Sequence, residues 1–281
     1  YPKLNSNPQY HLDEIIKALK TAQSYLPRVD AIGISSAGVY VNNETKVASL
    51  FIQVEANDYE KVRHIYRDAV SAIGDIPFEV ANDGDVTALA GAMSLGCNNL
   101  LGIAMGTSEA VGYVNRHGAI TGFLNELAFA PLDFNDEGAV DEWSGDYGCG
   151  VKYLSQDAII RLAKTAGIDI DPSLSLAKQL ECVQKLVEER NEQAIEVFKT
   201  VGVYLGYAIL YYHHFYQMDY VMLLGRVTSG YGGVIMIEHV MSIIEIENAK
   251  LAHVIQIILP DESSRRVGQS VAAASLVELK E

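Results

Sequence analysis

The sequence predicts an α/β protein, and three observations support this class. Short apolar runs at residues 29–34, 78–81, 100–105 and 220–224 are typical of buried strands. Longer segments with apolar residues at helical spacing lie between these runs. Most of the runs end in small or polar residues, and α/β proteins bind ligands where strands end. The alternation of the two patterns favours helices packed on a sheet.

The first half of the chain shows the order helix, strand, strand, helix, strand, helix. Pro27 ends the first helix, and the small residues 35–38 form a turn after the first strand. The expected elements are a helix at 11–25, strands at 29–34 and 47–54, a helix at 58–73, and a strand and helix at 78–96.

A second unit of the fold begins near Asn99. Residues 121–147 follow no regular pattern and are rich in acids, which suggests a functional loop. The regular elements expected here are strands at 100–105, 111–115, 220–224 and 254–259, helices through most of 148–217 with a break at 167–172, and helices from 230 to about 247 and at 267–279.

Composition narrows the class of protein. The 281 residues suggest about two domains, and the formal net charge of −15 argues against a broad nucleic-acid surface. The cysteines Cys97, Cys149 and Cys182 form neither a disulfide framework nor a paired metal motif, so a reducing cytoplasm is the expected compartment. No apolar run approaches ~20 residues, so we expect no membrane partner.

The turn Asn82-Asp83-Gly84-Asp85 joins a predicted strand to a predicted helix. Short polar side chains at such a position accept hydrogen bonds from the first free N–H groups of the helix. The same position is where α/β folds contact ligands. Local sequence alone leaves both interpretations open.

Three strand-to-loop junctions, after Val80, Met105 and Leu224, have an order and spacing that resemble the ROK family of sugar kinases and regulators. Asn82-Asp83 resembles the family's Asn-Asp motif, residues 122–127 its Gly-Glu-Leu-Gly-His segment, and Gly106-Thr107 the start of its second phosphate loop. Gly225 and Gly230 stand where its adenosine loop would be. The resemblance implies an actin/hexokinase/Hsp70-like ATPase fold of ribonuclease H-like type with two lobes, residues 1–98 plus 265–281 and residues 99–264.

The resemblance also implies a function, glucokinase-like transfer of the ATP γ-phosphate to a hexose hydroxyl. Asp83 would be the general base, and Asn82 and Glu126 would bind the sugar. Gly106, Thr107, Gly225 and Gly230 would bind ATP with Mg²⁺. Phosphoryl transfer depends mainly on positioning and charge stabilisation, which suits these residue types. A homodimer is expected from the family and from the aromatic segment 211–216.

The second phosphate loop departs from the family pattern. Side chains replace three of its glycines in Gly106-Thr107-Ser108-Glu109-Ala110-Val111-Gly112. A Glu109 carboxylate ~4 Å from a phosphate would cost on the order of 4 kcal/mol. Alternatively, Glu109 points to solvent or forms a structural salt bridge. Thr107 is equally consistent with a simple turn hydroxyl.

The family's zinc site is also incomplete. Phe129 takes the place of its histidine, Cys149 alone represents the cysteine cluster, and Val151 replaces a glutamate that touches the sugar. Zinc needs about four nitrogen or sulfur ligands, so we expect no structural zinc. Cys149 is expected to be a small buried apolar residue. Glu142 or Asp146 could compensate for the lost sugar contact, although a solvated acidic loop explains both.

The family's first phosphate loop, Asp-x-Gly-Gly-Thr, does not occur in this sequence. Because the chain begins at Tyr1 without a methionine, we expect that the first lobe is truncated. The departures also support a second hypothesis, a non-catalytic sugar-binding or regulatory protein that retains the fold.

Overall fold

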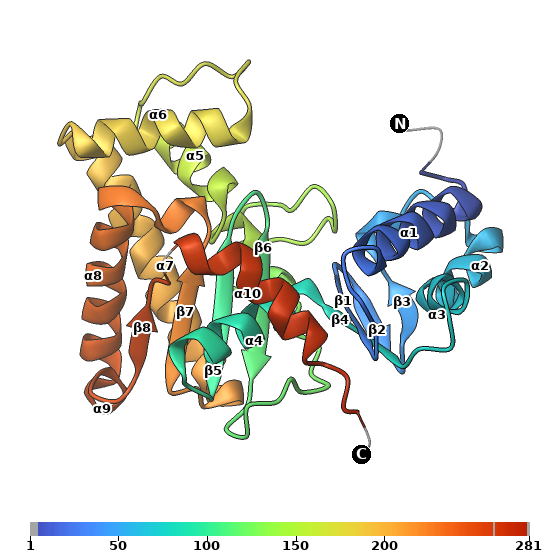
Figure 1. The fold of residues 1–281 in the computed structure, drawn as a ribbon. Coiled ribbons are helices and arrows are strands. Elements are labelled where there is room, and N and C mark those ends of the chain that lie inside the picture. The colour runs from blue at the N-terminus through green and yellow to red at the C-terminus, as the bar shows by residue number, and fades with distance from the viewer. Residues whose placement is uncertain (1–4, 261, 280–281) are drawn as a thin grey trace. The chain divides into compact units, whose positions relative to one another are not determined.

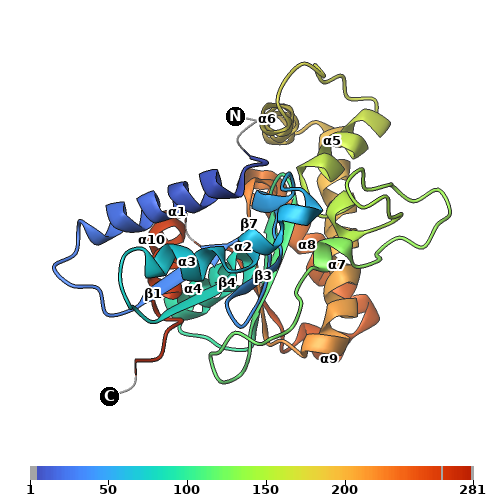
Figure 2. The ribbon, with the colours of Figure 1, turned by 90° about the vertical axis from the view of Figure 1, so that its right-hand side faces the viewer.

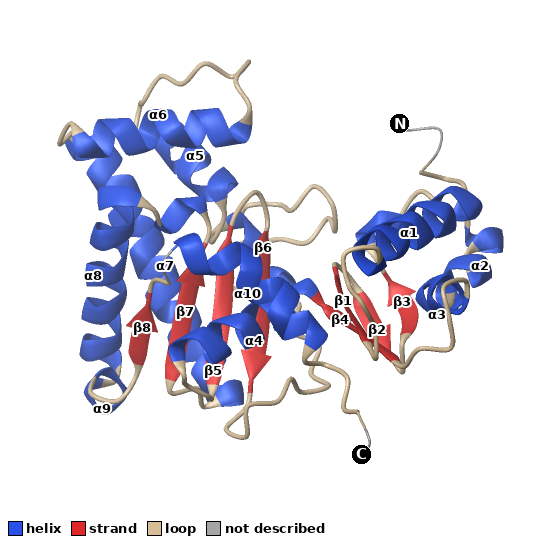
Figure 3. Cartoon of the chain, in the orientation of Figure 1, coloured by secondary structure: helices blue, strands red, loops and turns tan. Residues whose placement is uncertain are grey.

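A computed structural model describes residues 5–260 and 262–279. The chain divides into two compact units, Tyr1–Ser94 with Glu262–Glu281 and Leu95–Asp261. Each unit contains both helices and strands (Figure 3). The C-terminal helix belongs to the first unit, so that unit is assembled from both ends of the sequence.

The first unit contains two small sheets and the helices that cover them (Figure 1). Its strands are β1 (Ile32–Ser36), β2 (Val39–Val41), β3 (Glu44–Val47) and β4 (Phe78–Asn82), and its α-helices are α1 (Pro8–Gln23), α2 (Glu60–Arg63), α3 (Ile65–Ser71), α4 (Asp83–Leu95) and α10 (Glu262–Ala274).

Strands β1 and β4 are parallel, and their last residues, Ser36 and Asn82, are register partners. Strands β2 and β3 form an antiparallel hairpin. One buried core joins Phe51, Ile65, Tyr66 and Val80, and α1 adds Leu12 to it. The carboxyl ends of β1 and β4 are therefore held at one edge of a packed sheet.

The second unit is built on a four-stranded sheet with the order β6-β5-β7-β8. Its strands are β5 (Leu100–Met105), β6 (Glu109–Val114), β7 (Tyr220–Leu224) and β8 (Gln256–Ile258), and its α-helices are α5 (Gln156–Thr165), α6 (Leu176–Glu188), α7 (Glu192–Tyr216), α8 (Gly230–Glu247) and α9 (Ala249–Ala252).

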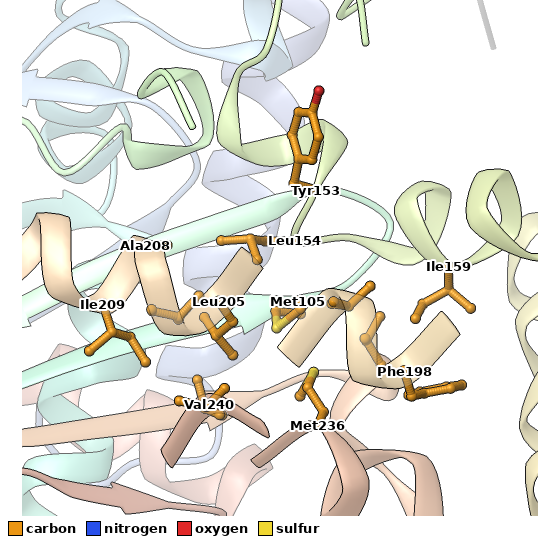
Figure 4. Close-up of a cluster of buried hydrophobic side chains, with 14 of the residues drawn as sticks. Met105, Tyr153, Leu154, Ile159, Phe198, Leu205, Ala208, Ile209, Met236 and Val240 are labelled. Atoms are coloured by element: carbon orange, nitrogen blue, oxygen red, sulfur yellow. The ribbon is translucent and has the colours of Figure 1, made fainter. Parts of the chain in front are cut away.

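Strands β5, β7 and β8 are parallel, and β6 runs antiparallel at the edge. Helices α7 and α8 lie side by side (Figure 2). Figure 4 shows the core beneath them, where Leu205 of α7 and Met236 of α8 meet Met105 of β5. Among the described helices, α7 is the one long and apolar enough to cross a membrane by length and composition, and half of its apolar window is buried in the protein. Core helices share this pattern.

The structure confirms the α/β class and most predicted elements, and it corrects two of them. The segment 47–54, predicted as a strand, contains the 3₁₀ helix Ser49–Phe51. Its buried apolar residues are Ala48, Phe51 and Val54, and this spacing of three differs from the spacing of two that one face of a strand requires. The helix predicted at 58–73 is interrupted at His64, which leaves helical geometry between α2 and α3.

Candidate functional site

The predicted Asn82-Asp83 turn lies where β4 ends and α4 begins. The Asn82 amide connects two segments, because its Nδ2 donates to the Gly38 carbonyl at 2.9 Å and its Oδ1 accepts from the Gly84 N–H at 2.7 Å. The amide thus fixes the loop after β1 while it satisfies an N–H group of the first turn of α4. This structural role does not preclude a contact with a ligand.

Asp83 is half-buried at the first position of α4. Its Oδ1 accepts from the Gly84 N–H at 3.0 Å, and its backbone carbonyl accepts from the Thr87 hydroxyl at 2.7 Å. Asp83 is thus held in place at the edge where β1 and β4 end.

A chain of hydroxyl groups lies at the same edge, and the sequence analysis did not identify it. The Tyr40 hydroxyl donates to Ser36 Oγ at 2.8 Å, and Ser36 Oγ is 2.7 Å from the Tyr66 hydroxyl. Burial raises the pKa of Tyr40, and the Tyr66 hydroxyl and the Asp83 carboxylate add to the increase. The only sequence signal was Ser36 in the predicted turn after the strand at 29–34.

The loop after β5 carries the predicted phosphate-binding residues. The Gly106 N–H donates to the Ser108 carbonyl at 2.9 Å, and the Gly106 carbonyl accepts from the Gln156 N–H at 2.8 Å. Thr107 and Ser108 are exposed. A Cβ on Gly106 would meet only Ser108 O at 3.5 Å, so the fold does not require glycine here. Both polar backbone groups of Gly106 are hydrogen-bonded, so what glycine leaves open to a ligand is the space of the missing side chain.

The predicted adenosine loop begins at Gly225, directly after β7. Gly225 has φ +99°, and a Cβ there would clash with the Met105 carbonyl at the end of β5. Gly230, with φ +67°, begins α8, and the Glu188 carboxylate accepts from the next N–H group, that of Tyr231, at 2.8 Å. Because β5 and β7 are parallel neighbours, the loops after them meet at one edge of the sheet.

Glu109 corrects a prediction about the phosphate loop. Its side chain points neither to solvent nor into a salt bridge: the residue is 5% exposed, and neither carboxyl oxygen has a hydrogen-bond partner among the described residues. Burial raises the pKa of Glu109 to about 8, so the group is mostly neutral at pH 7. A neutral carboxyl group carries no net charge to repel a phosphate.

Glu126 is half-buried just before the 3₁₀ helix Leu127–Phe129. The neighbouring Asn125 is 8% exposed, and its Oδ1 accepts from the Tyr216 hydroxyl at 2.9 Å. A second contact fixes the other side of the segment, where the Gly150 N–H donates to the Ala130 carbonyl at 2.9 Å. The backbone around Glu126 is therefore anchored both to α7 and to the segment that contains Cys149.

The segment that resembles the zinc motif is held by other contacts. Cys149 is 1% exposed, as predicted for a small apolar residue. The rings of Phe129 and Trp143 are 5.3 Å apart. Within the described residues, no group of three or more His, Cys, Asp or Glu side chains is placed to hold a metal ion.

Lys152, which the sequence analysis missed, provides the strongest of these contacts. Its Nζ lies 3.0 Å from Glu142 and 2.6 Å from Asp157, and its side chain is 7% exposed. Burial acts to lower the pKa of Lys152, but the hydrogen bonds to Asp157 and Glu142 outweigh it and keep the pKa above its usual value. The Glu142 side chain is 82% exposed, as expected for a solvated acid, and through Lys152 it also links the acidic loop to Asp157 at the start of α5.

The candidate residues therefore form two groups, one in each unit. Asn82 and Asp83 share the edge of the first unit with Ser36, Tyr40 and Tyr66. The second unit carries the two loops predicted to bind nucleotide and also Glu126; in sequence order, its candidate residues are Gly106, Thr107, Glu126, Gly225 and Gly230.

Comparisons with known proteins agree with this arrangement. The chain matches the model of the ROK family over residues 2–274. A comparison with curated protein sequences gives no significant match.

Among solved structures, a ROK hexokinase from Thermus thermophilus superposes with a TM-score of 0.70 at 17% identity, covering 94% of this chain and 85% of that one. A ROK glucokinase from Streptomyces griseus, in complex with glucose and AMPPNP, gives 0.67 at 17% identity, with coverage of 94% and 87%. A ROK transcriptional regulator, a homologue of the E. coli MLC protein, gives 0.72 at 19% identity, with coverage of 95% and 67%.

These similarities show the actin-like ATPase fold, and the family match extends over nearly the whole sequence. The neighbours include both enzymes and a regulator, so the fold alone does not decide between those roles. The chain belongs to the ROK family.

Proposed function

We propose that the protein is an ATP-dependent sugar kinase that transfers the γ-phosphate to a hexose hydroxyl. The observation that carries the proposal is the position of Asp83, half-buried at the start of α4 beside an edge lined with hydroxyl groups. Sugars are recognised by polar groups that exchange hydrogen bonds with their hydroxyls. The kinases among the structural neighbours, one of them bound to glucose and AMPPNP, support this substrate class.

In this proposal Asp83 accepts the proton of the attacking hydroxyl as the new O–P bond forms and the bond to ADP breaks. General-base assistance of this kind contributes about 10²–10⁴-fold to a rate. Asn82 and Glu126 would hold sugar hydroxyls. Because the Asn82 amide also fixes the Gly38 loop, its orientation is set before the sugar arrives.

The nucleotide would lie at the edge of the second unit. Gly106 and Thr107 would approach its phosphates, and the loop from Gly225 to Gly230 would accept the adenosine. The free space beside Gly106 and the neutral state of Glu109 are compatible with an anionic group here. Nucleotide phosphates supply much of the coordination of Mg²⁺ in such enzymes, so a metal ion would enter with the nucleotide.

The first test is hexose-dependent release of ADP from the full-length protein, measured in a coupled assay over a panel of hexoses. The proposal predicts turnover with at least one sugar and none without sugar. ATP hydrolysis that is independent of every sugar, or no turnover at all, would contradict it.

A second candidate function is non-catalytic sugar sensing. It is favoured by the replacement of family residues by Phe129 and Val151, by the altered phosphate loop, and by the regulator among the structural neighbours. Calorimetry would then detect hexose binding in a protein that releases no ADP. Robust turnover with any hexose would dismiss this candidate.

A further inference from the structure

Glu109 is a buried acid for which the proposed reaction has no use. It is the first residue of β6 and directly follows the loop Gly106–Ser108. At 5% exposure, both of its carboxyl oxygens lack a hydrogen-bond partner among the described residues. An isolated buried carboxylate is costly, so a sequence that keeps an acid here needs a structure that favours its neutral form.

The surroundings of Glu109 connect two loops of the candidate site. Glu109 Oε2 lies 2.7 Å from the point that a Cβ on Gly150 would occupy, and the Leu127 carbonyl oxygen lies 2.7 Å from the same point. Gly150 therefore leaves a space that both oxygens border. One belongs to the strand after the phosphate loop, and the other belongs to the residue after Glu126.

A protonated carboxyl group suits this geometry, and an ionised one does not. The neutral form carries one O–H donor, which can serve a carbonyl oxygen, whereas the carboxylate only accepts. An ionised Glu109 offers no donor, whereas the Leu127 carbonyl, which accepts from the Ala130 N–H at 2.9 Å, keeps a second lone pair for an O–H group. The proton on Glu109 therefore decides whether a hydrogen bond can join the two loops at this point.

The charged and titratable groups on the neighbouring elements do not offset an ionised Glu109. On α7, the Tyr212 hydroxyl has no hydrogen-bond partner among the described residues, and burial together with the Glu109 charge raises its pKa. Beside Gly150, burial raises the pKa of the Cys149 thiol. The nearby ammonium group of Lys152 is already bound to Glu142 and Asp157.

We propose that Glu109 is a positioning residue whose protonated carboxyl group joins the phosphate loop to the Glu126 loop through the Leu127 carbonyl. Loss of the proton loosens residues 121–130 and the loop at 106–108 together. The connection lies within one unit of the fold; its consequence for substrate binding rests on the proposed function.

The test is hydrogen–deuterium exchange of the whole protein at pH 6.5 and pH 9, followed by mass spectrometry and corrected for the intrinsic effect of pH. Peptides covering residues 121–130 should exchange roughly tenfold faster at pH 9 in the wild type. Glu109→Gln keeps a neutral N–H donor at every pH, so its protection should not change with pH. Glu245→Gln, an exposed substitution on α8, is the control and should behave like the wild type.

Glu109→Leu provides a second variant if the glutamine protein folds poorly. It lacks a donor at every pH, so residues 121–130 should be weakly protected at both pH values. Equal protection of the wild type at the two pH values would overturn the proposal. A pH-dependent loss in Glu109→Gln or Glu109→Leu as large as that of the wild type would also overturn it.

Calorimetry with hexose on the same samples separates this proposal from the proposed function. Affinity should fall between pH 6.5 and pH 9 in the wild type and stay constant in Glu109→Gln. If hydrogen–deuterium exchange responds to Glu109 but no hexose binds, the link between the loops is upheld and the proposed kinase function is contradicted. Hexose affinity that is equal at both pH values in the wild type would overturn the positioning role.

Discussion

The backbone of Gly225 lies against the carbonyl group of Met105, so closely that a Cβ at position 225 would clash with it. This contact joins the end of β7 to the end of β5 and brings the two predicted nucleotide loops to one edge of the sheet. Gly106, one residue after Met105, has no such constraint. The two glycines therefore differ in what they do for the protein.

Substitution should separate these two roles. Gly225→Ala introduces a side chain at φ +99° and against a backbone carbonyl. The free energy of unfolding should therefore fall by about 1–3 kcal/mol or more. Gly106→Ala should change stability by no more than ~0.5 kcal/mol, yet weaken nucleotide binding. Urea unfolding and calorimetry with a nucleotide measure the two effects. Equal destabilisation by both substitutions would show that Gly106 is also structural.

The buried ammonium group of Lys152 should contribute strongly to stability. Lys152→Met removes the cation that binds Asp157 and Glu142, at an expected cost of about 1–3 kcal/mol in the free energy of unfolding. Lys178→Met is the matched control, because its partner Glu181 and Lys178 itself are both exposed and such pairs contribute about 0–1 kcal/mol. Similar losses in the two variants, measured by urea unfolding, would contradict this role.

The hydroxyl chain at the edge of the first unit should affect hexose affinity. Tyr40→Phe removes the hydrogen bond to Ser36 Oγ, which should cost about 1 kcal/mol of stability and weaken hexose binding roughly fivefold. Tyr59→Phe also removes a tyrosine hydrogen bond, to the Lys46 carbonyl, and serves as the control. Calorimetry should show an affinity change in Tyr40→Phe alone; unchanged affinity there would exclude the chain from sugar binding.

Stability should depend on pH through Glu109. Its pKa is about 8 in the folded protein and ordinarily 4.5, so between these values the folded state binds the proton more tightly than the unfolded state. The contribution of this group to stability is complete below about pH 4.5 and is lost as the pH rises through about 8. The loss is at most about 5 kcal/mol.

Glu109→Gln removes this titration. Its free energy of unfolding should therefore exceed that of the wild type increasingly from pH 5.5 to pH 8.5, as measured by urea unfolding. For Glu245→Gln, the free energy of unfolding plotted against pH should run parallel to that of the wild type. A Glu109→Gln curve that is also parallel would mean that Glu109 does not change its proton affinity on folding.

Much of the fold could be predicted because its strands are short apolar runs with distinct ends. The runs at 78–81, 100–105 and 220–224 correspond to β4, β5 and β7, of which β5 and β7 are largely buried. The strand prediction for residues 47–54 was wrong. β-branched and aromatic residues favour a strand by propensity, whereas tertiary packing buries residues of this segment that are three positions apart. Local propensity could not reveal that choice.

Only those parts of the candidate site that consist of residues close together in the sequence could be predicted. Asn82 and Asp83 mark a strand-to-helix turn, which a local pattern can reveal. The hydroxyl chain from Tyr40 through Ser36 to Tyr66 and the ion pairs of Lys152 depend on contacts between distant segments. The direction of the Glu109 side chain was likewise set by the space beside Gly150, which no local pattern records.

The assignment of Asp83 as general base is the central claim, and one comparison tests it most directly. Asp83→Asn keeps the size and the capping geometry of the side chain but removes its basicity. The hexose-dependent turnover number should fall by about 10²–10⁴-fold, with hexose affinity and stability close to those of the wild type. A variant that phosphorylates hexose as fast as the wild type would contradict the claim.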